Sequence, residues 1–196
     1  MEGAVALFRK YGIRSVSMDD ICREMGISKK TMYQYVSNKA DLVQKVLESQ
    51  SAMVFDMIDG MKTSELNAID TLLEVSQKLG ALHKDSNPVI QYDLEKYYPD
   101  IHKKHREVRD KIIFTNLREN IRQGIKEGLY REDLNPDLLA DLYIRKMEGI
   151  NDADCYPSGK FSYHRMFNAM IENHIRGISN EKGLTYFENQ KHKINF

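Results

Sequence analysis

The sequence predicts an all-α fold. Apolar side chains recur at helical spacing through most of the 196 residues, and no segment alternates apolar and polar residues for long. No Asn-Gly or Asp-Gly dipeptide lies between β-branched runs, so the usual sequence signal of a β-hairpin is missing. Prolines and small polar residues stand where helices would begin, which divides the chain into helices of ordinary length.

The end signals of the first helices are the clearest. Ser17 is expected to cap the second helix, with the carboxylate of Asp20 three residues further on. Gly26 accepts the left-handed backbone that ends this helix, and Ser28 caps the third. Ser37 is expected to cap the fourth.

Later helices have similar punctuation. Asn87 and Asn135 precede Pro88 and Pro136 as caps, and Pro99 separates the sixth helix from the seventh. Helices are therefore expected over residues 3–11, 18–25, 29–36, 39–58, 65–84, 88–97, 100–127, 136–150, 162–178 and 183–189.

Composition excludes several classes of protein. Basic and acidic side chains number 29 each, so the whole chain lacks the charge of a strongly basic nucleic-acid binder. Cys22 and Cys155 match no disulfide, redox or metal spacing, which fits a reducing compartment. No apolar stretch approaches the ~18–20 residues of a membrane span, and no secretory leader follows Met1. We therefore expect a cytoplasmic protein that does not contact the membrane.

The most informative segment runs from Ser17 to Leu42. Two short helices separated by a glycine turn have the geometry that presents the second helix to the major groove of DNA. An apolar seam between them is expected from the spacing of Ile21, Met25, Ile27, Met32 and Val36. The outward or flanking side chains of the second helix are donors, amides and hydroxyls that can address base edges and phosphates: Lys29, Lys30, Thr31, Gln34 and Tyr35. Lys39 follows in the first turn of the fourth helix, where a cation can meet a phosphate.

These residues closely resemble the Tet-repressor family of transcriptional regulators. The matching features are Ala4-x-x-Leu7-Phe8-x-x-Tyr11-Gly12, Ile21-Cys22, Met25-Gly26-Ile27-Ser28, Met32-Tyr33 and Ser37-Asn38-Lys39-x-x-Leu42. The stretch Gly124-Ile-Lys-Glu-Gly-Leu-Tyr also resembles one often found in the sensor domains of this family. Family members usually carry more residues before the alanine that corresponds to Ala4, so either an N-terminal arm is absent or Met1 is not the true start.

The resemblance implies an organisation and a function. Residues 1–47 would form a helix-turn-helix DNA-binding domain, and residues 48–196 a helical ligand-binding and dimerisation domain. It implies that Ser17, Tyr33 and Lys39 hold phosphates, whereas Lys29, Lys30, Thr31 and Gln34 approach bases. The chain would be a ligand-responsive repressor that binds a palindromic operator as a homodimer.

Soft apolar side chains in the middle helices are candidates for an effector pocket. Met53, Met57 and Met61 recur every fourth residue, and methionine adapts to ligands of varied shape. Aromatic and apolar residues of the following helices extend the set: Tyr92, Tyr97, Phe114 and Leu117. The expected effector is an apolar small molecule between the fourth and seventh helices. Core packing is the alternative explanation of the same pattern.

The last long helix has a continuous apolar stripe, which is the main indication of a dimer. Its members are Phe167, Met170, Ile171, His174, Ile175 and Ile178. Leu138, Leu139 and Leu142 offer a second apolar face, and in the family such helices pair between subunits. A single chain could instead bury both faces in its own core.

Other chemistries have weaker support. Cys22 could act as a redox switch, but its position suits a small buried residue. His83, His102 and His105 lack a matching carboxylate or cysteine, so we expect neither metal nor cofactor. No Ser/His/Asp set or phosphate loop supports an enzyme. An adaptor made of helical hairpins is the third alternative, which the lysine cluster disfavours.

Overall fold

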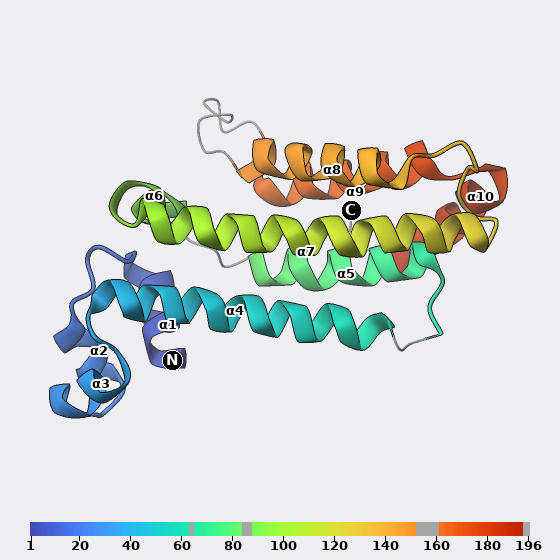
Figure 1. The fold of residues 1–196 in the computed structure, drawn as a ribbon. Coiled ribbons are helices and arrows are strands. Elements are labelled where there is room, and N and C mark those ends of the chain that lie inside the picture. Colours follow the sequence, from blue (N-terminus) through green and yellow to red (C-terminus); the bar gives the residue numbers. More distant parts are fainter. Residues whose placement is uncertain (63–64, 84–87, 152–160, 194–196) are drawn as a thin grey trace. The chain divides into compact units, whose positions relative to one another are not determined.

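A computed structural model of the chain describes residues 1–62, 65–83, 88–151 and 161–193 (Figure 1). Its α-helices are α1 (Glu2–Tyr11), α2 (Met18–Glu24), α3 (Lys29–Tyr35), α4 (Lys39–Lys62), α5 (Ala68–His83), α6 (Pro88–Tyr97), α7 (Pro99–Lys126), α8 (Pro136–Asn151), α9 (Tyr163–Ile178) and α10 (Glu181–Gln190). Their ends agree with the predicted ends to within four residues. β-Type pairing in the described residues is one isolated bridge, between Tyr130 and Ser179. The all-α prediction is confirmed.

The chain divides into two compact units, which do not coincide with a simple N-terminal and C-terminal half. The first unit comprises Met1–Met57 and Asp85–Arg109, and the second comprises Ile58–Lys84 and Asp110–Phe196. Helix α6 and the start of α7 therefore belong with the helix-turn-helix. The functional boundary expected after residue 47 stays a prediction.

The first unit has a core of its own. It is built from apolar residues of α1 to α4, and Leu94 of α6 is buried in the same cluster. Ile21 of α2, Met32 of α3 and Val36 are all buried there, so the predicted seam between the two short helices is present. Burial of this seam fixes the angle at which α3 is held.

Local end signals explain these short helices. Ser17 and Asp20 form a complete capping box at α2, and the Ser28 hydroxyl accepts the N–H of Thr31 at the start of α3. Gly26 has φ 64°, the left-handed conformation that the turn requires. The prediction for Ser37 is corrected, because Asn38 Oδ1 accepts the N–H of Asp41 and caps α4.

The caps of later helices are partly described. Asn135 Oδ1 accepts the N–H groups of Asp137 and Leu138 and so caps α8 as predicted. Asn87 and Cys155 lie outside the described residues, as does the side chain of His83. Three caps that were not predicted precede α5, α9 and α10, where Asn67, Ser162 and Asn180 accept N–H groups of the first turn.

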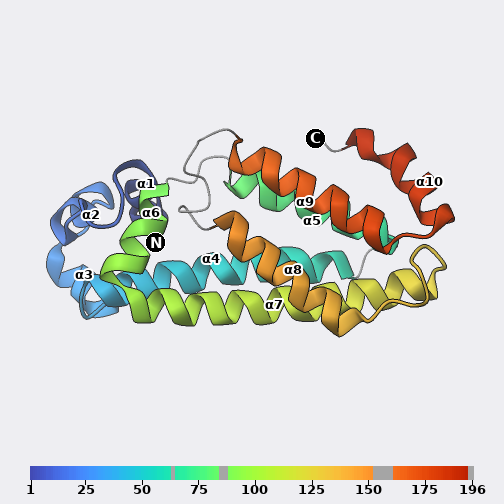
Figure 2. The same cartoon turned by 90° about the horizontal axis from the view of Figure 1, so that it is seen from above.

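The second unit buries the apolar stripe of α9. Helix α9 packs against α5 and α8, its neighbours in Figure 2. All six stripe residues are buried in this core: Phe167, Met170, Ile171, His174, Ile175 and Ile178. Within the single chain these side chains are covered by their own core, which favours the alternative that one chain buries the stripe itself; their assignment to a dimer interface stays a prediction. Leu142 of α8 remains 44% exposed and Leu138 is also exposed.

Close packing explains the glycine at the end of α7. A Cβ on Gly124 would overlap the ring of Tyr130, which is fully buried. The Tyr130 hydroxyl donates to Asn120 Oδ1 at 3.2 Å, and Asn120 Nδ2 donates to the carbonyl of Ala68 at 2.8 Å. The glycine thus lets the chain turn back onto α7 and bring a tyrosine into a buried polar network.

Among the described residues, no helix is both long enough and apolar enough to cross a membrane.

Candidate nucleic-acid interface

Helix α3 presents polar and aromatic side chains on its outer face. Lys30, Gln34 and Tyr33 are exposed, and Tyr35 is 72% exposed. A tyrosine that far out of a core has lost most of the burial that normally stabilises its ring. This is the face expected of a helix that meets a partner, and it contains the residues predicted to approach DNA.

The hydroxyl groups of Thr31 and Ser17 are already hydrogen-bonded within the chain. The Thr31 hydroxyl lies 2.9 Å from the Ser28 hydroxyl, beside the cap of α3. The Ser17 hydroxyl donates to Asp20 Oδ2 at 2.6 Å and belongs to the capping box of α2. Either hydroxyl would have to share these bonds in order to bind a base or a phosphate.

Lys29 is paired with an acid in the structure. Its Nζ lies 2.7 Å from Asp19 Oδ1, and this hydrogen bond and charge raise the pKa of Lys29. Both side chains are more than half exposed, so the pair contributes little to stability. DNA binding would exchange the carboxylate of Asp19 for a phosphate or a base acceptor.

Lys39 lies at the start of α4 and faces the segment between α1 and α2. Its Nζ donates to the carbonyl oxygen of Arg14 at 3.2 Å. Partial burial lowers the pKa of Lys39, and the charges of Asp93 and Asp20 act in the opposite direction. The ammonium group of Lys39 is therefore held against the carbonyl oxygen of Arg14.

Sequence reasoning missed two side chains that hold this region. Lys45 Nζ donates to the carbonyl of Tyr35 at 2.5 Å and pairs with Asp41 at 3.1 Å, which fixes the end of α3 against α4. The spacing of Asp41 and Lys45, four residues apart on a helix, was the available signal. Asp93 of α6 accepts the backbone N–H of Arg14 at 2.8 Å, and no local pattern announces this contact.

The residues predicted to line an effector pocket are distributed over both compact units, and their grouping into one site stays a prediction. Met53 is 69% exposed, and the hydroxyl of Tyr92 accepts a hydrogen bond from Lys96. Tyr97 stacks under the guanidinium of Arg14. Met61, Phe114 and Leu117 belong to the second unit, whereas Met53, Met57, Tyr92 and Tyr97 belong to the first. Leu117 is buried in the core of the second unit, so for this residue core packing is the better explanation.

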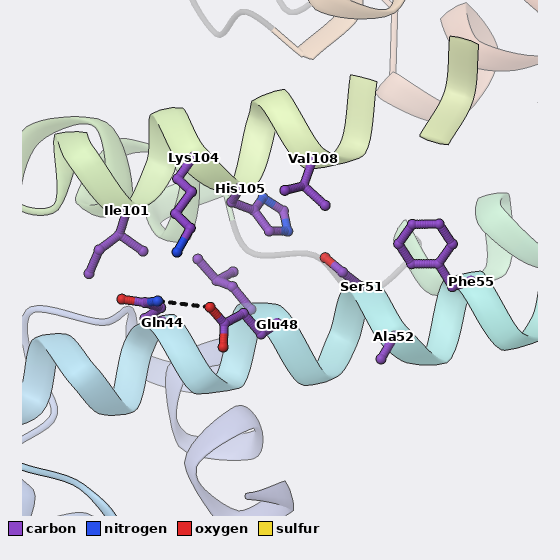
Figure 3. A pocket seen from close by; sticks show the side chains of 10 residues that line it. Gln44, Glu48, Ser51, Ala52, Phe55, Ile101, Lys104, His105 and Val108 are labelled. Carbon is purple, nitrogen blue, oxygen red and sulfur yellow. Dashed lines mark hydrogen bonds between the residues drawn. The ribbon is translucent and has the colours of Figure 1, made fainter. Parts of the chain in front are cut away.

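A different hollow lies within the first unit, between α4 and the start of α7 (Figure 3). Its volume is about 180 Å³. Apolar side chains from both helices form much of its wall: Leu47, Ala52, Phe55, Ile101 and Val108. Polar side chains stand beside them: Gln44, Glu48, Ser51, Lys104 and His105. Gln44 donates to Glu48 at 2.8 Å along one wall.

The described residues offer no arrangement that supports a redox switch or a metal site. Cys22 is buried in the core of the first unit, as a structural thiol would be. No three His, Cys, Asp or Glu side chains in this part of the chain are grouped to hold a metal ion. His102 contacts Gln91 at 3.0 Å, and burial lowers its pKa.

Comparison with known proteins finds a family match over the helix-turn-helix. Residues 1–46 match the sequence model described as "Bacterial regulatory proteins, tetR family". None of the curated proteins compared matches the chain.

Solved structures resemble the chain over most of its length. A transcriptional regulator from Cytophaga hutchinsonii has a TM-score of 0.74 at 18% identity, with 91% of this chain and 96% of that chain covered. The regulator FadR from Bacillus subtilis, solved with stearoyl-CoA, has a TM-score of 0.66 at 20% identity, covering 90% and 96%. A putative TetR-family regulator from Mesorhizobium loti has a TM-score of 0.66 at 19% identity, covering 91% and 94%. At these identities the likeness concerns the fold.

Proposed function

We propose that this chain, whose residues 1–46 match the model of the tetR family of bacterial regulatory proteins, is a ligand-responsive repressor that binds a palindromic operator as a homodimer. Regulators of this family bind DNA and are not enzymes. Repression needs only that the bound protein occupies the promoter, so the proposal asks for no further surface that recruits polymerase. The site of action is the cytoplasm, where the DNA is.

The outer face of α3 carries the proposal. Lys30, Gln34 and Tyr35 are exposed on a helix whose other face is fixed by Met32 in the core. Exposed amides, hydroxyls and cations on a rigidly held helix are what readout of base edges requires. Lys39, held at the start of α4, would contact the phosphate backbone beside it.

A palindromic operator presents the same half-site twice, so we propose that two copies of the chain bind it as a homodimer. We place the dimer interface on the outer faces of α8 and α9. Leu138 and Leu142 lie four residues apart and are exposed on α8. On α9 the exposed residues Ala169, Asn173 and Gly177 repeat every fourth position. Small residues let two helices approach closely, and the leucines would supply apolar area in an isologous contact.

The hollow between α4 and α7 is the proposed effector site. It offers apolar walls beside Glu48 and Lys104, and its roughly 180 Å³ suits a small apolar group that carries a polar end. The similar FadR was solved with stearoyl-CoA, an amphipathic ligand. An effector that binds only one arrangement of these helices would shift the population away from the DNA-binding state.

DNA binding is the first test of the proposal. The purified chain is mixed with a library of randomised duplexes, and the bound fraction is sequenced over successive rounds. We expect a palindrome whose half-sites are centred roughly 34–36 Å apart, one helical turn. Recovery of a single unrepeated half-site would contradict the homodimer, and the absence of any enriched sequence would contradict operator recognition.

Repression and the effector site are tested with the recovered operator. Placed in a promoter upstream of a reporter gene, it should lower expression when the chain is produced. Replacing Ala52→Phe should fill the hollow and abolish release by an effector found by thermal-shift screening, while operator affinity is retained. Ala6→Phe, at an exposed position of α1, is the matched control. An effector that still acts on Ala52→Phe binds elsewhere.

A further inference from the structure

A buried carboxylate joins α6 to the segment that holds Lys39. Asp93 of α6 is only 3% exposed, although acidic side chains are almost never fully buried without a partner. Its Oδ2 accepts the backbone N–H of Arg14 at 2.8 Å. A charge-assisted hydrogen bond of this kind is stronger than one between neutral groups.

Arg14 links Asp93 to the proposed DNA-binding surface. The carbonyl oxygen of the same residue accepts the hydrogen bond from Lys39 Nζ at 3.2 Å. Asp93 therefore binds the backbone N–H of Arg14 while Lys39 binds its carbonyl oxygen. Arg14 lies 79 positions from Asp93 and 25 from Lys39 along the chain. Displacing Arg14 would displace the ammonium group of Lys39.

Two further contacts between α6 and this segment act at the same place. Gly12 has φ 80°, and a Cβ on it would come within 3.1 Å of Asp93 Oδ2 and 2.9 Å of the Val89 side chain. The guanidinium of Arg14 lies 4.5 Å from the centre of the Tyr97 ring, and its Nη1 donates to the Tyr97 hydroxyl. Val89, Asp93 and Tyr97 of α6 thus lie against the segment from residue 12 to residue 14.

We propose that Asp93 is a positioning residue for DNA binding, which acts through the backbone of Arg14 to place Lys39 against a DNA phosphate. This inference rests on the proposed function. It makes α6 part of the DNA-binding machinery through its contact with Arg14. Any movement of α6 that breaks the Asp93–Arg14 hydrogen bond would loosen a phosphate contact.

Simple electrostatics makes the opposite prediction, which allows a clear test. A carboxylate near a DNA-binding lysine repels phosphate, so its removal should tighten binding if charge alone mattered. Asp93→Asn removes the charge but keeps an oxygen that can accept from Arg14. Asp93→Ala removes both the charge and the acceptor, and leaves the N–H of Arg14 without its partner.

The experiment measures operator affinity of the full-length dimer between 50 and 200 mM salt by fluorescence anisotropy. The variants are Asp93→Asn, Asp93→Ala, Lys39→Ala and the double variant Asp93→Ala/Lys39→Ala, each with its melting temperature recorded. Each lost phosphate contact lowers the salt slope by about 0.9, so a palindrome loses about 1.8. The affinity ratio of wild type to Asp93→Ala should then narrow roughly tenfold over this salt range.

We expect Asp93→Ala to match Lys39→Ala in slope and to have no further effect in the Lys39→Ala background, because the two act as one unit. Asp93→Asn should keep the wild-type slope. A merely structural role would lower the melting temperature without this change of slope or this non-additivity.

Three results would overturn the inference: additive losses in the double variant, an unchanged slope in Asp93→Ala, or an Asp93→Asn variant as weak as Asp93→Ala. Failure of the proposed function is separate, because there the wild-type chain itself would bind no operator; that result would remove the role of Asp93 together with the function.

Discussion

Acidification is expected to destabilise the second unit through His174. This side chain is buried on α9, and its ring lies edge-on to Tyr143 with 5.0 Å between ring centres. Its Nε2 has no hydrogen-bond partner among the described residues. Burial, with a smaller contribution from the charge of Lys146, lowers the pKa of His174 from 6.5 to about 4.

The size and sign of the effect follow from this shift. Between pH 6.5 and about 4 the unfolded chain binds a proton at His174 that the folded chain does not bind. Unfolding therefore takes up protons in this window, and the free energy of unfolding falls as the pH falls. Lowering the pKa of His174 from 6.5 to about 4 corresponds to roughly 3 kcal/mol of unfolding free energy at full protonation. Above pH 6.5 the contribution of His174 is constant.

Urea unfolding followed by circular dichroism from pH 4 to pH 8 measures this dependence. The matched variant is His174→Phe, which keeps an aromatic ring against Tyr143 but cannot be protonated. Carboxylates titrate alike in both proteins, so the difference between the two curves isolates His174. The difference should appear below pH 6.5 and grow toward pH 4. Parallel curves over the whole range would refute the assignment of a buried neutral imidazole.

Three more predictions concern the interface, a glycine and the dimer. Gln34→Ala should cost about 1–3 kcal/mol of binding free energy at particular base positions in a randomised operator and leave the salt slope unchanged. Lys39→Ala should instead weaken binding to all sequences alike and lower the salt slope. The reverse pattern would mean that α3 is oriented differently on DNA. Gly124→Ala should destabilise the chain by about 1–3 kcal/mol in urea unfolding, because its Cβ would overlap Tyr130, while Gly149→Ala, with open space at its Cβ, should be neutral or stabilising. Leu142→Glu should yield monomers in sedimentation velocity with lower operator affinity, and an unaltered dimer would exclude this face of α8 from the interface.

The helices could be predicted because their signals are local. A cap and its N–H groups lie within three residues of each other, so Ser17 and Ser28 announce α2 and α3 by themselves. The one wrong cap arose where two candidates are adjacent. Asn38 binds the N–H of Asp41, while the Asp41 carboxylate accepts the N–H of Ser37, and spacing alone does not choose between them.

The candidate interface was predictable in outline for the same reason. With Met32 in the core, helical periodicity requires Lys30 and Gln34 to face outward, and both do. The partners of the lysines were not predictable, because they come from other elements. Lys29 pairs with Asp19 of α2, and Lys39 is held through Arg14 by a carboxylate on α6. Such contacts depend on how helices pack, which no single window of sequence contains.

The effector pocket shows why residue type is a weaker guide than position. Methionine and tyrosine suit a ligand, but Met53 faces solvent and Leu117 fills the core of the second unit. The hollow that we propose as the effector site is lined by other residues of α4 and α7, with Phe55 and Val108 among its apolar walls. A cavity is a failure of two surfaces to interdigitate, so it arises from the geometry of a pair of helices and not from the composition of either one.

The apolar stripe of α9 supports a general argument about interfaces. A period of 3.6 residues states that one face of a helix is apolar, but it says nothing about which neighbour covers that face. In this chain α5 and α8 pack against α9, so the stripe is already buried within the single chain. The residues left for a partner are those that the periodicity passes over, Ala169 and Gly177 on α9 with Leu142 on α8. Substituting the stripe would therefore unfold the second unit, whereas Ala169→Arg should leave the melting temperature nearly unchanged and still prevent the two copies from meeting.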